Sequence, residues 1–101
     1  MPAINLNSSD TTYTSVASSA TVVDIVAENG NRVGLMIFND STAVLYLRID
    51  GAATTSDYTI KLAAGAFYEM PRGYFTDKVT GIWAAENGSA KITEICTKSR
   101  Q

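Results

Sequence analysis

The chain contains no histidine, one cysteine and two prolines among its 101 residues. Without histidine, a serine or cysteine nucleophile lacks its usual base, and a zinc site loses its usual nitrogen ligand. The single thiol, Cys96, excludes an internal disulfide, so the fold must hold without covalent cross-links, which is compatible with a reducing compartment. We therefore expect neither a hydrolase nor a zinc enzyme.

Charged residues are also few, at 18% of the chain with a net charge of −2. The eight basic residues are scattered and form no stripe that would neutralise a phosphate backbone. No apolar run approaches the roughly 20 residues that cross a bilayer, and the first residues lack the pattern of a signal peptide. We expect no nucleic-acid partner and no membrane partner, and interpret the chain as a soluble protein made inside a cell.

The acidic residues and glycines do not predict a reaction or a cofactor. Asp24, Glu69 and Glu94 fall in separate predicted strands, and no spacing pairs them as acid and base. Asp50 and Asp57 offer oxygen ligands suited to calcium, but turn chemistry explains them better. No glycine-rich phosphate loop is present. We expect a protein that is not an enzyme and has no cofactor, metal or small-molecule substrate.

What the sequence does contain is typical of strands. Ser and Thr supply 21 residues, and no window of a dozen residues has helical periodicity. The predicted strands are 21–27, 32–39, 44–49, 58–62, 66–70, 79–85 and 90–95. We expect an all-β domain over residues 20–101, an antiparallel β-sandwich or jelly roll of about six to eight strands.

Two pairs of neighbouring strands are predicted to form hairpins. Strands 32–39 and 44–49 are joined by a short polar turn, which favours a hairpin at the centre of a sheet. Asn87 and Gly88 lie between two β-rich runs, and an Asn-Gly pair in that setting is a strong hairpin signal. A tight turn is also expected at 28–31, where Asn and Gly readily take positive φ.

Alternating apolar residues predict which side chains face the core. The run 34–38 is apolar on both faces, as expected of a central strand covered on both sides. Tyr58, Ile60 and Leu62 are expected to point inward. Trp83 is expected in the core or at an interface rather than in a ligand site.

Residues 1–19 are mostly polar, and we expect an extended N-terminal arm with a short strand near 13–17. Such a segment is either a frayed terminus or an arm that orders on a neighbouring subunit. The second interpretation stays open because of its spaced apolar residues, Ile4, Leu6, Tyr13 and Val16, which are candidate partner-binding residues.

A second candidate contact lies in a predicted loop. Tyr74 and Phe75 are adjacent aromatic residues that follow Pro71, Arg72 and Gly73. The two rings cannot easily point inward at the same time. Either the pair packs locally or at least one ring is presented to a partner.

Four stretches carry a resemblance to a known class of proteins. They are the Asn-Arg-Val-Gly-Leu strand and its Asn-Asp-Ser turn at 31–41, Ser-Asp-Tyr-Thr at 56–59, the aromatic-Glu-Met-Pro segment at 67–71, and Gly-Ile-Trp at 81–83. In this order they resemble small β-sandwich structural proteins of tailed bacteriophage particles, over roughly residues 20–95. The resemblance brings no catalytic residues.

The resemblance implies a structural virion protein assembled in the host cytoplasm. The leading expectation is a capsid decoration or cement subunit that binds the major capsid protein. The alternative is a tail, fibre, adsorption or connector component that binds a neighbouring virion protein or a host surface glycan. A symmetric homo-oligomer is expected, with a trimer favoured by analogy.

Overall fold

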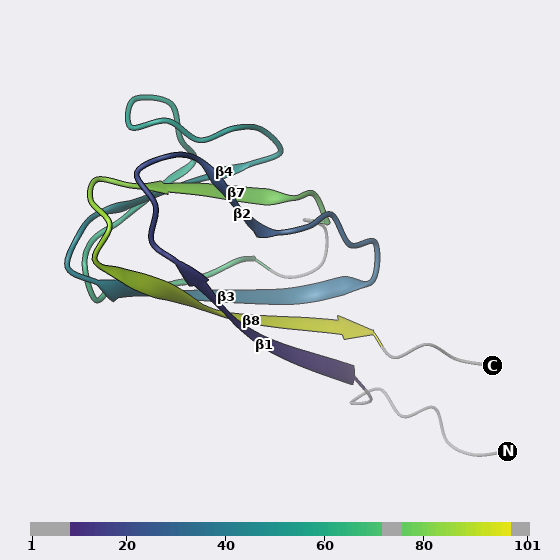
Figure 1. Ribbon diagram of the computed structural model, residues 1–101. Coiled ribbons are helices and arrows are strands. Elements are labelled where there is room, and N and C mark those ends of the chain that lie inside the picture. The colour runs from purple at the N-terminus through teal and green to yellow at the C-terminus, as the bar shows by residue number, and fades with distance from the viewer. Residues whose placement is uncertain (1–8, 72–75, 98–101) are drawn as a thin grey trace, which may run out of the picture.

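The computed structural model describes residues 9–71 and 76–97, and every regular element in these ranges is a β-strand (Figure 1). The eight strands are β1 (Ser9–Ala17), β2 (Val23–Val26), β3 (Arg32–Ser41), β4 (Leu45–Ile49), β5 (Ile60–Leu62), β6 (Phe67–Glu69), β7 (Val79–Trp83) and β8 (Gly88–Thr97). The all-β prediction is confirmed.

The strands form two four-stranded sheets that pack face to face. Sheet A has the order β1-β8-β3-β6, and sheet B has the order β2-β7-β4-β5, with every neighbouring pair antiparallel. Consecutive strands alternate between the sheets, except for β4 and β5, which pair with each other. This connectivity is that of a jelly roll, so the chain realises the more specific of the two predicted β architectures.

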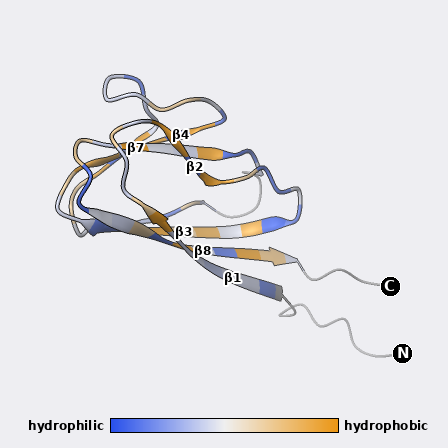
Figure 2. Ribbon diagram, in the orientation of Figure 1, coloured by the Kyte–Doolittle hydropathy of each residue, from blue (hydrophilic) through white to orange (hydrophobic). Residues whose placement is uncertain are grey.

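The core lies between the sheets and follows the two-residue period of the strands. Leu35 and Ile37 of β3 face Leu45 and Leu47 of β4, and all four side chains are fully buried. Trp83 of β7 is 1% exposed, as predicted for a core residue. Figure 2 shows the matching hydrophobic segments in β4 and β7 of sheet B and in β3 and β8 of sheet A.

The predicted hairpin between residues 32–39 and 44–49 is wrong, because β3 lies in sheet A and β4 in sheet B. The chain crosses between the sheets at residues 42–44. Asn39, fully buried at the end of β3, donates from Nδ2 to the carbonyls of Ala43 (2.8 Å) and Leu62 (2.9 Å). These bonds tie the crossover to sheet B, a long-range arrangement that the local turn composition does not reveal.

The second predicted hairpin is also wrong, since β7 belongs to sheet B and β8 to sheet A. Gly88 has φ of 147°, and a Cβ there would lie 2.5 Å from the carbonyl oxygen of Asp40 and 2.6 Å from Cα of Ser41. The glycine therefore allows β8 to approach β3 closely, rather than turning the chain back on β7. Residues 27–31 lead from sheet B to sheet A. The tight turn predicted there is present, since the N–H of Arg32 donates to the carbonyl of Asn29 at 3.1 Å, but Gly30 and its Asn neighbours do not take positive φ.

Two predicted inward orientations also need correction. In the run 34–38, Leu35 and Ile37 are buried, but Phe38 is 37% exposed, so β3 is covered on one face only. Tyr58 is 38% exposed rather than inward, because β5 begins at Ile60 and Tyr58 belongs to the preceding loop.

Strand β1 lies within the segment expected as an arm. It pairs with β8 of the same chain along all nine of its residues, from Ser9 opposite Thr97 to Ala17 opposite Ser89. Residues 9–17 thus form an edge of sheet A and are longer as a strand than the short stretch expected near 13–17.

Candidate docking surface

The structure describes two of the six candidate partner-binding residues, and it places them on opposite faces of β1. Tyr13 points away from the core and is 76% exposed. Val16 is half-buried and packs against the core. Ile4, Leu6, Tyr74 and Phe75 lie outside the described residues. The structure therefore does not join Tyr13 and Val16 into one surface.

Tyr13 instead shares a surface with side chains of the neighbouring strands, on the side of sheet A that faces away from sheet B. Directly opposed residues of antiparallel strands point to the same face. Two such rows cross the sheet from β1 through β8 and β3 to β6: Tyr13–Thr93–Met36–Glu69 and Ser15–Lys91–Phe38–Phe67. We call these eight residues the outer face.

Aromatic side chains are prominent on the outer face. Phe38 and Phe67 stand directly opposite each other on β3 and β6, and they are 37% and 57% exposed. Tyr13 lies at the other edge of the sheet, while Lys91 and Glu69 are the charged members of the two rows. In Figure 1, no described segment of the chain lies beyond sheet A on the side that faces away from sheet B.

The corresponding side of sheet B is covered by the chain itself. Residues 50–59, which join β4 to β5, fold back over it, as the teal loop above β4 in Figure 1 shows. Arg48 donates to the Asp57 carboxylate at 2.8 Å, and the rings of Tyr46 and Tyr58 are 5.0 Å apart. Thr80 points outward from β7 but is 3% exposed.

Thr80 is buried by two hydrogen bonds with this loop. Its hydroxyl donates to the carbonyl of Gly51 at 2.6 Å and accepts from the backbone N–H of Ala53 at 2.9 Å. The two sheets therefore differ: sheet B carries its own cover, whereas sheet A presents the outer face.

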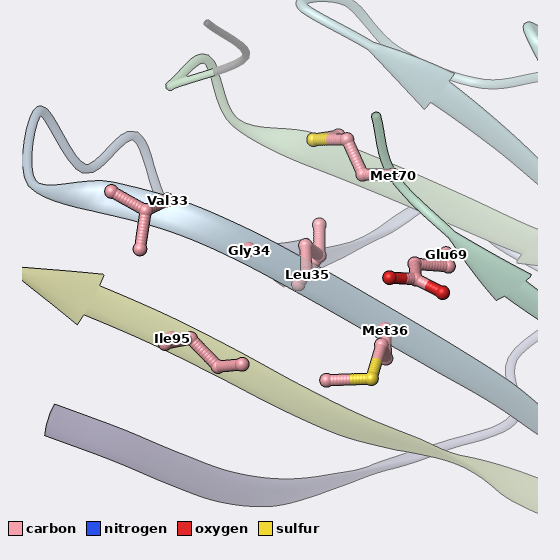
Figure 3. A pocket seen from close by; sticks show the side chains of 7 residues that line it. All are labelled: Val33, Gly34, Leu35, Met36, Glu69, Met70 and Ile95. Atoms are coloured by element: carbon pink, nitrogen blue, oxygen red, sulfur yellow. The ribbon is translucent and has the colours of Figure 1, made fainter. Parts of the chain in front are cut away.

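A cavity of about 210 Å³ opens beside the outer face, where β3 extends past the end of β6. It is lined by Val33, Gly34, Leu35, Met36, Glu69, Met70 and Ile95 (Figure 3). Gly34 has no side chain, and the side chain of Ile95 partly fills the space beside it. A Cβ at Gly34 would lie 3.5 Å from the Ile95 side chain. Figure 3 shows the Glu69 carboxylate directed toward Leu35 and Met36. The cavity suits one apolar side chain of a partner, with a carboxylate beside it.

Among the described residues, the three carboxylates considered as acid–base candidates lie apart on separate strands. Asp24, Glu69 and Glu94 lie on β2, β6 and β8. Glu94 accepts a hydrogen bond from Nε of Arg32 at 2.9 Å, and this guanidinium is buried. Within 9–71 and 76–97, no group of three acidic, Cys or His residues is placed to hold a metal ion.

The buried arginine closes one end of the sandwich. Arg32 donates to the carbonyl of Ala27 after β2 (2.6 Å) and to the carbonyl of Asp77 before β7 (2.8 Å). Cys96 lies nearby, and its pKa is raised by burial and by the charge of Glu94. This cluster joins both sheets.

The described residues also contain no helix long and apolar enough to cross a membrane. Comparison with protein-family models, with curated proteins and with solved structures found no match.

Proposed function

We propose that this protein is a non-enzymatic structural subunit of a virus particle, a capsid decoration or cement protein that docks on the major capsid protein through the outer face of sheet A. The observation that carries the docking step is the difference between the two sheets. Sheet B is covered by residues 50–59, and sheet A presents an aromatic face that no segment within 9–71 and 76–97 covers.

The composition of the outer face supports a protein partner. Exposed apolar patches on small domains mark interaction sites, and aromatic residues are enriched at the energetic centres of interfaces. Phe38 and Phe67 form a cross-strand pair, and the adjacent cavity is large enough for an apolar side chain of the partner. An open sheet face suits a broad protein surface better than a small molecule, which favours a concave site.

The virion assignment is supported by the phage-type sequence resemblance and by the jelly-roll topology, which recurs in viral capsid domains. The topology contributes by analogy, because one fold serves many functions. The proposal includes assembly in the host cytoplasm and self-association of the subunit. The resemblance implies a trimer, but the edge of strand β1 favours a two-fold dimer, and we adopt the dimer.

Sedimentation with empty capsid shells tests the proposal. The purified protein is mixed with shells of the major capsid protein, and bound copies are counted in the pellet over a range of concentrations. Wild-type protein is expected to saturate the shells. Phe67→Ser should weaken binding at least tenfold, since a central interface aromatic contributes more than about 1.4 kcal/mol.

Tyr58→Ser is the matched control, because it removes an exposed aromatic side chain from the side of sheet B. It should bind shells as the wild type does. Absence of bound copies would overturn the capsid proposal, and equal losses for the two variants would overturn the assignment of the outer face.

A further inference from the structure

The sandwich has four edge strands, β1 and β6 in sheet A and β2 and β5 in sheet B. Proteins protect such edges with short strands, bulges, charges or proline, because an open edge pairs readily with another strand. β5 and β6 are three residues long, β5 carries Lys61, and β6 is soon followed by Pro71. β2 has four residues and an irregular register between Asp24 and Val26.

Of these protections, β1 has only one charge near its end, Asp10, over its described length. It is nine residues long, contains no proline, and pairs with β8 without a register shift. Its one charged residue is Asp10, and the others are mainly Thr and Ser around Tyr13. In an antiparallel ladder, alternate residues direct their N–H and C=O groups away from the paired neighbour. β1 therefore presents a long, regular edge.

We propose that β1 pairs with β1 of a second copy of this chain, antiparallel and about a two-fold axis at Tyr13. Tyr13 is the midpoint of the nine residues, so this register pairs all of them. It sets Tyr13 opposite its counterpart and Asp10 opposite Val16 of the second copy, so no like charges meet. An aromatic cross-strand pair stabilises the ladder, and a two-fold interface of this kind closes on itself.

The pairing would join two copies of sheet A into one sheet of eight strands. Because Tyr13 lies in an outer-face row, the two outer faces would meet at the axis and become continuous. The inference does not depend on the proposed virion role, since it rests on the edge of β1 alone.

Charge substitutions at position 13 test both the pairing and its register. Sedimentation equilibrium is expected to show a wild-type dimer. Tyr13→Lys places like charges opposite each other and should raise the dimer Kd at least tenfold. An equimolar mixture of Tyr13→Lys and Tyr13→Glu should restore a dimer containing one copy of each. Phe67→Lys, a control on the opposite edge of sheet A, should remain dimeric.

A gain-of-affinity variant provides an independent check. The register sets Thr11 opposite Ser15 of the second copy, so combined Thr11→Lys and Ser15→Glu creates two opposite-charge pairs and should lower the dimer Kd about fivefold. A wild-type monomer or trimer, a failure of the mixed variants to pair, or no gain from the double variant would overturn the proposal.

Discussion

Replacing Asn39 by Asp probes the polar group that links the two sheets. The Asn39 side chain is fully buried, and its Oδ1 accepts a hydrogen bond from Nε1 of Trp83 at 3.2 Å. Its Nδ2 donates to three carbonyl oxygens, those of Ala43, Leu62 and Ala63, at 2.8, 2.9 and 3.1 Å. The substitution keeps the shape and the acceptor but removes the donor.

The size of the effect follows from these contacts. Each lost hydrogen bond costs about 1 kcal/mol, and each carbonyl left unsatisfied in the interior adds about 1–3 kcal/mol. The carbonyls of Ala43 and Ala63 also accept from the Ser41 hydroxyl and the Ala66 N–H. We therefore count two lost bonds and one unsatisfied carbonyl, that of Leu62, which gives about 3–5 kcal/mol of unfolding free energy. This is a large part of the stability of a small domain, which is about 5–15 kcal/mol.

The loss should depend on pH. Burial favours the neutral carboxyl, so the pKa of the new Asp in the folded protein should rise above its unfolded value of about 3.9. The variant is then most stable at pH values below the pKa of this carboxyl in the unfolded chain, where the protonated carboxyl can donate one hydrogen bond. This contribution to stability is lost as the pH rises through the pKa of the carboxyl in the folded protein. We expect a smaller deficit at pH 4 than at pH 7.

Urea unfolding followed by tryptophan fluorescence measures this deficit, because Trp83 is the single tryptophan and is buried. Asp40→Asn, the reverse exchange at the adjacent exposed position, is the control and should change stability by less than about 0.5 kcal/mol. A loss below about 1 kcal/mol for Asn39→Asp, or an equal loss at both pH values, would refute the reasoning.

Three further predictions concern the ends of the sandwich. Arg32→Ala should lower the unfolding free energy by about 3–5 kcal/mol in urea titrations, because it breaks a buried ion pair and leaves Glu94 without its charged partner. Adding Glu94→Gln should recover part of this loss, and full additivity of the two losses would contradict the pairing. Gly88→Ala should cost about 1–3 kcal/mol, since its Cβ would meet Cα of Ser41 at 2.6 Å, and an unchanged thermal midpoint would contradict that contact. Cys96 should react with iodoacetamide at pH 8 more slowly in the folded than in the urea-unfolded chain, because burial raises its pKa, and equal rates would contradict this.

The sequence predicts where the strands lie better than how they pair. Leu45, Leu47 and Ile49 alternate along β4 and lie on its inner side, as local periodicity indicates. The pairing partners depend on the crossovers between sheets, which a turn such as Asn87-Gly88 does not reveal, because hairpins and crossovers both favour Asn and Gly. The predicted hairpins failed for this reason.

The candidate site was harder to predict than the fold. Phe38 lies in an apolar run, and the sequence alone cannot distinguish a strand covered on both sides from one that exposes an aromatic face. Phe67 stands out only when its register with Phe38 is known. Similarly, Arg32 and Asn39 look like ordinary surface residues in the sequence, although both are buried and satisfied by distant backbone carbonyls.

The two proposed contacts act in different directions, and this makes them separable. Pairing along β1 extends sheet A within its own plane, whereas docking through Phe38 and Phe67 buries the face of that sheet. Loss of the β1 pairing through Tyr13→Lys should leave the contacts of Phe38 and Phe67 intact. It should weaken attachment through the lost second subunit, as multivalency requires, and through Tyr13 itself, which belongs to the outer face. Loss of Phe67 should weaken attachment directly while the mass in solution stays that of a dimer. Residues 50–59 cover sheet B, so self-association and docking both use sheet A. The two contacts do not compete, because one uses the edge of that sheet and the other uses its face.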